Sequence, residues 1–399
     1  MEQVLYKLPD GWEWSNLTDI CTPSRKTVEP NPEEQYNYIG LENIESHTGK
    51  VISDSPTKGS EISSTKVSFK KGMVLYGKLR PYLNKVVVAK IDGIATTEII
   101  PFECSDAISP DFLAYYLRSQ YFVDLAMNNC SGARMPRATT KLFTQIAKVP
   151  VTSITEQKRI VEKLDALLTR IDTAIEHLQE SVTLADALSK NGLSEIFESL
   201  KNRYEVVPLS SVVKINSGIA LPKLFKNGFS DGDIPFFKVA QMNNHHETMV
   251  APEITFNETV AKEHKIKLFP KGSTLIPKRG GAILTNKKRM LLEDASYDSN
   301  IMGLKADESK ISDEYLFAFM RTIDLANFVD ASTIPQVNNK HIDQMQIPLA
   351  SIEEQADVVS RVNLLVKKVE TMNSEIQRQL DDLQALKSSI LDSAFKGEL

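Results

Sequence analysis

The chain has 399 residues, of which 42% are apolar and 25% are charged, and its net charge is −5. This length permits two or three globular domains, and the average composition excludes a disordered or fibrous protein. No apolar run approaches the ~20 residues of a membrane-spanning helix, and the first residues lack the basic-then-apolar pattern of a secretion signal, so we expect a cytoplasmic protein with no membrane partner. Cys21, Cys104 and Cys130 form no C-x-x-C pair, so we expect reduced cysteines and neither a disulfide framework nor a zinc site.

The distribution of charge says more than its sum. A negative net charge argues against nucleic-acid binding, which depends on neutralising phosphates. Residues 66–90, however, contain seven Lys or Arg and no Asp or Glu, and residues 262–289 contain nine with only Glu263 against them. Both segments are therefore candidates for binding DNA, and a solvated basic surface is the plain alternative.

In the first part of the chain, short apolar runs of strand length such as "VLYGKL" and "KVVVAKI" alternate with turn signals, and a helix is predicted over 109–127. Lys78 and Arg80 lie at a strand end that enters a proline turn, where an extended cation can reach a phosphate or a guanine edge. Arg134 and Arg137 flank a proline loop, where turn hydrogen bonding is the alternative role. The candidate DNA contacts of this half are Lys78, Arg80, Lys85, Arg134, Arg137 and Lys141.

A long amphipathic helix is predicted next, over residues 153–200. Its apolar positions, spaced by three and four residues, are close to the seam of a coiled coil, and Gly192 leaves a break open. The segment "TSITEQ" before it is a good helix start, so Glu156 is explained by the helix N-terminus rather than as a catalytic carboxylate. The predicted seam is Ile160, Leu164, Leu167, Ile171, Ala174, Leu178, Val182 and Ala185.

The second half repeats the first in the same order. Pro150 and Pro348 are 198 residues apart, as are Gln157 and Gln355, and the second seam, Val358 to Leu383, repeats the first 198 residues on. "FPKGSTLIPKRGG" answers "FKKGMVLYGKLRP", and "IPQVNNK" answers the loop at Arg134 and Arg137, with amides that are suited to reading adenine. The candidate DNA contacts of this half are Gln241, Asn243, Lys278, Arg279, Lys287, Lys288, Gln336, Asn338 and Lys340, of which Lys278 and Arg279 take the related place to Lys78 and Arg80, and Lys340 aligns with Lys141.

The repeat predicts an α/β (α+β) fold with an internal pseudo-twofold duplication. We expect globular domains at residues 1–152 and 201–350, and helices at 153–200 and 351–399. If the two seams pack on each other, the second helix runs antiparallel to the first and returns the C-terminus to the start of the chain. Two similar but unequal domains on one chain fit the reading of an asymmetric, split DNA site, with the helices setting the gap.

The ordered motifs resemble the specificity subunit of type I restriction-modification systems. The motifs that carry the resemblance are "LPDGWEW", "YGKLRPYLNKV", "VPVTSITEQKRIVEKLD" with its copy, and the closing "ILDSAFKGEL". The resemblance implies that the two domains are target recognition domains and that the helices are conserved spacers on which two methyltransferase subunits dock. Those partners would bind S-adenosylmethionine and methylate adenine, and motor-nuclease subunits would join them for restriction, while this chain binds double-stranded DNA without catalysis or a cofactor of its own.

Two rival functions remain at this point: a coiled-coil adaptor that does not read DNA, and an autonomous DNA methyltransferase. The absence of N-P-P-Y/F, G-x-x-x-x-G-K-[ST] and H-E-x-x-H motifs disfavours the second rival. His245 and His246 are adjacent on a polar loop, which rarely suffices for a metal ion. Trp12 and Trp14 fit core positions better than base-stacking ones.

Overall fold

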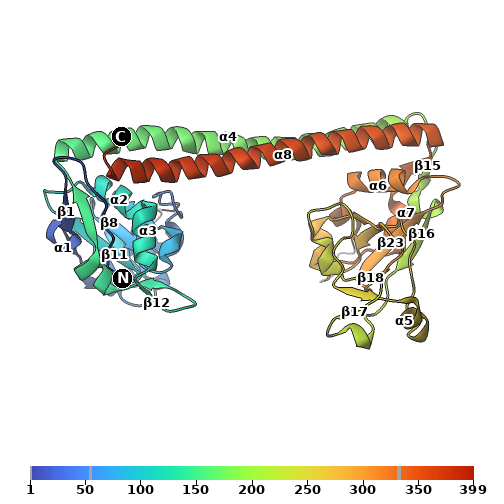
Figure 1. The fold of residues 1–399 in the computed structure, drawn as a ribbon, viewed down its shortest axis with the longest axis horizontal. Helices are drawn as coiled ribbons and strands as arrows, with labels where there is room; N and C mark the ends of the chain where they lie inside the picture. Colours follow the sequence, from blue (N-terminus) through green and yellow to red (C-terminus); the bar gives the residue numbers. More distant parts are fainter. Residues whose placement is uncertain (1, 54–55, 330–333) are drawn as a thin grey trace. The chain divides into compact units, whose positions relative to one another are not determined.

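The computed structural model describes residues 2–53, 56–329 and 334–399. The chain divides into two compact units: the first consists of Met1–Gln179 with Gln377–Leu399, and the second of Glu180–Ile376. Each unit contains β-sheets, short helices and one end of each of two long helices, α4 (Ile154–Lys201) and α8 (Ile352–Phe395) (Figure 1). The predicted α/β (α+β) class with duplicated domains and long helices is confirmed.

The central sheet of the first unit has four antiparallel strands. The strands in spatial order are β2 (Cys21–Pro23), β11 (Ile99–Cys104), β8 (Val74–Gly77) and β9 (Val86–Val88). Val74, Leu75 and Tyr76 of β8 are all buried, because β8 lies inside the sheet with both faces covered. One face packs on the core that includes Phe112 from α2 (Pro110–Arg118) and Phe122 from α3 (Gln120–Met127).

The central sheet of the second unit repeats this order strand for strand. Its strands are β16 (Val213–Ser217), β23 (Ile301–Ala306), β20 (Thr274–Pro277) and β21 (Arg289–Met290). The helix α6 (Asp313–Thr322) contributes the same kind of core, with Tyr315, Leu316 and Phe319 buried. The duplication predicted from the sequence is therefore a duplication of the sheet.

The second sheets of the two units differ. In the first unit the spatial order is β3 (Thr27–Val28), β7 (Lys66–Phe69), β10 (Gly93–Ala95) and β5 (Tyr38–Ile39). In the second unit it is β17 (Phe229–Asp231), β19 (Ile254–Phe256), β18 (Ile234–Phe237) and β22 (Ser296–Tyr297). The first contains one parallel pair, β10 with β5, whereas the second contains two, β18 with β22 and β17 with β19. The second unit adds β17 and β19 beyond β18 and follows them with α5 (Glu258–Glu263), so the copies diverge at this edge.

Small elements close each unit. The long helices are joined to the sheets by antiparallel pairs, β1 (Glu13–Asn16) with β14 (Lys148–Val151), and β15 (Val206–Pro208) with β24 (Gln346–Pro348). The remaining short elements are α1 (Leu17–Ile20), β4 (Gln35–Tyr36), β6 (Thr57–Lys58), β12 (Cys130–Ser131), β13 (Arg137–Ala138) and α7 (Asn339–Gln344).

The ends of the long helices are part of the cores. In the first unit, Ile160 and Leu164 of α4 share one buried cluster with Leu391 and Phe395 of α8, and the two helices lie side by side (Figure 1). Lys387 Nζ of α8 donates a hydrogen bond to Asp172 Oδ1 of α4 at 2.5 Å. The chain ends beside its beginning, since the Tyr6 hydroxyl donates to Phe395 O at 3.0 Å. The predicted return of the C-terminus to the start of the chain is confirmed.

In the second unit, Leu193, Phe197 and Leu200 of α4 are buried with Val358 and Val362 of α8. The helix α4 is continuous through Gly192, and a Cβ added there would lie 2.9 Å from Leu365 Cδ2, so the glycine permits close approach instead of breaking the helix. The predicted seam is wrong at two positions. Leu168 is buried whereas Leu167 is only half-buried, and Met372 is 41% exposed. The buried apolar positions differ there because they follow the turn of the helix toward each core.

The repeated Glu-Gln pair at the start of each long helix has a structural role. Gln157 is fully buried; its Oε1 accepts from Ser109 N at 2.8 Å, and its Nε2 donates to Ala107 O and Thr152 O at 2.9 and 2.8 Å. Gln355 makes the same three bonds with Ser312 N, Lys310 O and Ala350 O at 2.8, 2.9 and 2.9 Å. Each glutamine thus ties a long helix to the N-terminus of a core helix, α2 or α6.

The neighbouring glutamates lie on the surface side of each helix start. Glu156 binds the Arg159 guanidinium through two bonds of 2.8 and 2.7 Å, and this pairing lowers the pKa of Glu156. Glu354 instead accepts from Arg203 at 2.5 Å. Trp12 and Trp14 pack against the first core, as expected.

Candidate nucleic-acid interface

The first candidate interface is the point where β8 leaves the sheet and a second loop crosses it. Lys78 N donates to Glu98 O at 2.9 Å, Arg80 N donates to Pro136 O at 2.7 Å, and Ala138 N donates to Lys78 O at 2.8 Å. We call Lys78–Arg80, Glu98 and Pro136–Ala138 the first junction. Three backbone hydrogen bonds hold these segments together. The backbone positions from which the exposed side chains extend are therefore fixed.

The second unit contains the same frame. Lys278 N donates to Asn300 O at 2.7 Å, Gly280 N donates to Pro335 O at 2.9 Å, and Val337 N donates to Lys278 O at 3.0 Å. We call Lys278–Gly280, Asn300 and Pro335–Val337 the second junction. The bonds match one for one, and so do the isolated bridges, Leu79 with Arg137 and Arg279 with Gln336.

This match corrects one predicted pairing. Lys278 takes the place of Lys78, but Arg279 takes the place of Leu79, and Gly280 that of Arg80. Arg80 and Gly280 both have positive φ, 52° and 78°, which glycine adopts without strain and arginine does not. The sequence comparison paired the two arginines because both follow a lysine closely, whereas the backbone bonds fix the register one residue further along.

The exposed side chains of the two junctions differ. In the first junction, Arg137 Nε and Nη2 donate to the two carboxylate oxygens of Glu98, both at 2.9 Å. In the second junction the corresponding residues are Gln336 and Asn300, and Arg279 Nη2 donates to Gln336 Oε1 at 3.4 Å. A charged pair in one frame is replaced by two amides in the other.

Of the remaining candidates in the loops near the junctions, some side chains are exposed and one caps a helix. Lys141 and Lys340 are both exposed and lie three residues beyond Ala138 and Val337, so their predicted alignment holds in the structure. Arg134 is exposed, whereas Asn338 serves as the N-cap of α7, its Oδ1 accepting from Lys340 N at 3.1 Å.

Two of the remaining candidate lysines already donate hydrogen bonds within the protein. Lys278 Nζ donates to Ser217 Oγ at 3.1 Å, and Lys85 Nζ donates to Leu41 O at 2.6 Å. Lys287 is half-buried, and Asn243 is exposed.

Two candidates have side chains that are already bonded within the protein, and we withdraw them. Lys288 is only 7% exposed; its ammonium donates to Asn286 Oδ1 at 2.7 Å and to Ile323 O, and burial lowers its pKa to about 8. Gln241 uses both ends of its amide within its own loop, accepting from Lys238 N at 2.9 Å and donating to Ala251 O at 3.0 Å. Neither side chain can turn to DNA without breaking these bonds.

Sequence reasoning missed Glu98 and Asn300. Both lie outside the basic segments 66–90 and 262–289. Glu98 is also acidic, so a search for phosphate-binding cations does not find it. The signal that locates them is the repeat itself, because Ile99 and Ile301 begin equivalent stretches of β11 and β23, and the backbone oxygen of the residue before each accepts from the lysine of its junction.

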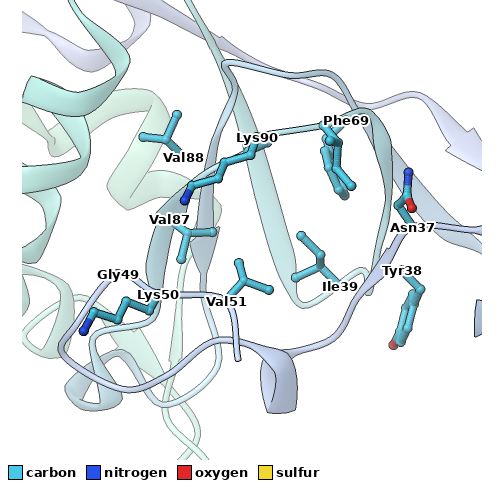
Figure 2. A pocket seen from close by; sticks show the side chains of 12 residues that line it. Asn37, Tyr38, Ile39, Gly49, Lys50, Val51, Phe69, Val87, Val88 and Lys90 are labelled. Carbon is cyan, nitrogen blue, oxygen red and sulfur yellow. The ribbon is translucent and has the colours of Figure 1, made fainter. Parts of the chain in front are cut away.

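The first unit also holds a cavity of about 310 Å³ away from the junction. Figure 2 shows Ile39 of β5, Phe69 of β7 and Val87 of β9 among its lining side chains, with Lys50 and Lys90 beside them. Val87 pairs with Leu75, and in the second unit the paired position opposite Leu275 is Arg289. Arg289 is buried and donates to Asn244 O at 2.8 Å, so a bulky cation takes the place of a cavity-lining valine.

Within the described ranges, no three His, Cys, Asp or Glu side chains gather in an arrangement that could hold a metal ion. Among the helices of the same residues, none combines the length and apolar character needed to cross a membrane. Cys21, Cys104 and Cys130 are free thiols, and burial raises the pKa of Cys21 to about 12.

The fold and the two junctions define a protein with two copies of one recognition unit on a single chain. The family model for the type I restriction modification DNA specificity domain matches residues 9–184 and 201–381. The chain belongs to this family, and it is a specificity subunit of type I restriction-modification systems.

Relatives cover the chain to different extents. The chain is 22% identical over 434 residues to the type I restriction enzyme StySPI specificity subunit of Salmonella potsdam, covering 98% of this chain and 90% of that protein. It is 26% identical over 193 residues to the EcoDI specificity subunit of Escherichia coli, where the match spans 48% of this chain and less than half, 43%, of the relative. A solved chain from work on assembly and conformational transition of the type I system has a TM-score of 0.84 at 23% identity, covering 99% of this chain and all of the other, which shows the same fold.

Proposed function

We propose that this chain selects a split, asymmetric site in double-stranded DNA, with one half of the site read by each unit. The observation that supports this proposal is the repetition of one backbone frame in both junctions with different exposed polar side chains. A shared frame places side chains in the same way against a duplex, and unequal side chains then read unequal sequences.

Local charge supports DNA as the partner. Lys141 and Lys340 are exposed beside the two junctions, and residues 66–90 and 262–289 remain rich in cations although the whole chain is negative. Exposed cations neutralise phosphates and hold the protein on the duplex, while the side chains at the junctions read base edges. The helices α4 and α8 would set the gap between the two halves of the site.

The chemistry would belong to partner subunits. We propose that methyltransferase subunits, which carry S-adenosylmethionine, dock on the long helices, that motor-nuclease subunits join them for restriction, and that this chain performs no catalysis in the cytoplasm where the complex acts. Leu184 and Leu188 of α4 are 68% and 62% exposed and lie one helical turn apart, so together they offer an apolar strip to a partner.

The test uses the complex of this chain with its methyltransferase subunits and selects bound duplexes from a randomised pool. The wild type should select two separated half-sites. Arg80→Gly removes a cation and leaves the residue found at the equivalent position 280, so it should reduce preference in one half only, by about tenfold. Lys26→Ala, at an exposed lysine of the same unit outside both basic segments, is the matched control and should leave both halves unchanged.

The outcomes discriminate between the candidate functions. Equal loss in both halves with Arg80→Gly would show that Arg80 supplies general electrostatics. Selection of no sequence by the wild-type complex would refute DNA reading and favour the adaptor.

A further inference from the structure

We propose that Arg137 is a guanine-reading residue held in place by Glu98, and that Gln336 with Asn300 confers a preference for adenine at the equivalent position of the other half-site. This inference rests on the proposed function, and it deepens it by assigning one base to each junction. The observation behind it is the exchange of a bidentate ion pair for two amides in otherwise matching frames.

The geometry of Arg137 leaves one edge of its guanidinium for an outside acceptor. Arginine has five N–H donors in a plane, and Glu98 accepts from Nε and from one N–H of Nη2. One N–H of Nη1 and the second N–H of Nη2 point together along the end of the guanidinium. That end matches the O6 and N7 acceptors of guanine in the major groove.

Glu98 is itself fixed, so it can orient Arg137. Its backbone oxygen accepts from Lys78 N at 2.9 Å, which anchors it to the same frame that holds residues 136–138. Its side chain is 26% exposed and that of Arg137 is 48% exposed, so the carboxylate lies deeper and the arginine lies toward solvent. The pair therefore presents the arginine outward, with its plane held by two bonds.

The ion pair with Glu98 also distinguishes Arg137 from cations that bind phosphates. A guanidinium and a carboxylate together carry nearly no net charge, so the pair releases few counterions when DNA binds. A carboxylate facing the phosphate backbone is unfavourable unless its partner makes a directed contact. Arg137 is thus suited to base recognition, and Lys141, which is exposed and forms no ion pair with the residues that the structure describes, is suited to phosphate.

The second junction offers a different pattern of donors and acceptors. The Gln336 carboxamide has an oxygen that accepts from Arg279 Nη2 at 3.4 Å and can accept a second bond, and an NH₂ group that donates. One donor and one acceptor side by side match N7 and the N6 amino group of adenine. Asn300, in the place of Glu98, brings no charge to this frame.

The test exchanges the two pairs in the complete complex. Glu98→Asn with Arg137→Gln gives the first junction the side chains of the second, and Asn300→Glu with Gln336→Arg does the reverse. Duplex selection should show one position of the first half changing from guanine to adenine in the first double variant, with a 10- to 100-fold change in preference, while the other half stays unchanged. The reverse exchange should change one position of the second half from adenine to guanine.

Two single variants test the positioning role of Glu98. Arg137→Lys keeps the charge but cannot donate along two edges, so guanine preference should fall while salt dependence stays the same. Glu98→Gln should lower guanine preference at the same position with an unchanged melting temperature, and Glu98→Asp should restore part of it.

The proposal fails if the first double variant still selects guanine, or if it weakens several positions in both halves alike. This failure is distinct from failure of the proposed function, in which the wild-type complex selects no sequence in either half.

Discussion

The two junctions share their backbone bonds and differ in the side chains that reach the surface. Lys78 and Lys278 each receive a backbone bond from the crossing loop and donate one to the residue before β11 or β23. Around that common frame, Arg137 and Glu98 stand where Gln336 and Asn300 stand in the other copy. The comparison teaches that the duplicated fold supplies positions and that the surface residues supply specificity.

The interiors of the two units differ as well. Val87 of β9 corresponds to Arg289 of β21, because each lies opposite the equivalent leucine of β8 or β20, Leu75 or Leu275. Lys288 directly precedes Arg289, as Val86 precedes Val87. The second unit buries these cations by bonding them to backbone oxygens of Ile323 and Asn244. The second copy therefore buries cations where the first buries valines, so we expect the two units to respond differently to pH.

The largest effect is expected where the copies are identical. Gln157→Leu and Gln355→Leu each remove three hydrogen bonds from a buried glutamine to the backbone, so each should destabilise its own unit by about 3 kcal/mol. Hydrogen exchange should show faster exchange in α2 for the first variant and in α6 for the second. Gln145→Leu, at an exposed position, is the control. Equal loosening of both units by either variant would contradict separate clamps.

The buried lysine sharpens the difference between the units. Burial lowers the pKa of Lys288 to about 8, against 10.5 in the unfolded chain, and Asp324 and Lys190 make opposing smaller contributions. Between pH 8 and 10.5 the unfolded state binds more protons, so stability rises with pH in this window, by on the order of 2 to 3 kcal/mol.

Lys288→Met should remove this rise, and Lys287→Met should keep it. Urea unfolding of the second unit at several pH values between 7.5 and 10.5 measures the effect. Parallel pH dependence in the wild type and Lys288→Met would show that the lysine keeps an ordinary pKa.

A smaller and symmetric effect is expected for the two exposed lysines beside the junctions. Lys141→Ala and Lys340→Ala should each weaken DNA binding a few-fold and lower the slope of log K against log salt by about 1. Neither should change base preference, because a phosphate contact carries no sequence information. Titration of labelled duplex at several salt concentrations tests this, with Lys26→Ala, an exposed lysine outside both basic segments, as the control. A change of selected base with either variant would assign that lysine to base reading.

The sequence predicted the duplicated order, the long helices and the return of the C-terminus, because a gapless offset of 198 residues and a periodic apolar stripe are properties of sequence alone. It also located Arg137 and Gln336 at matching loops. It could not predict that Lys288 is buried, since a run of lysines looks like surface until the opposite strand is known. Nor could it align Arg80 with Gly280, because that register depends on hydrogen bonds to a loop 56 residues away, at Pro136.

The central claim is that each unit reads its own half of the site through the same frame. Duplex selection by the complex of this chain with its methyltransferase subunits, performed with Arg137→Ala and with Gln336→Ala, tests it most directly. Each variant should lose preference at one position by roughly 10- to 100-fold, and the two positions should lie in opposite halves of the site. Equal weakening of both halves by both variants would contradict the account.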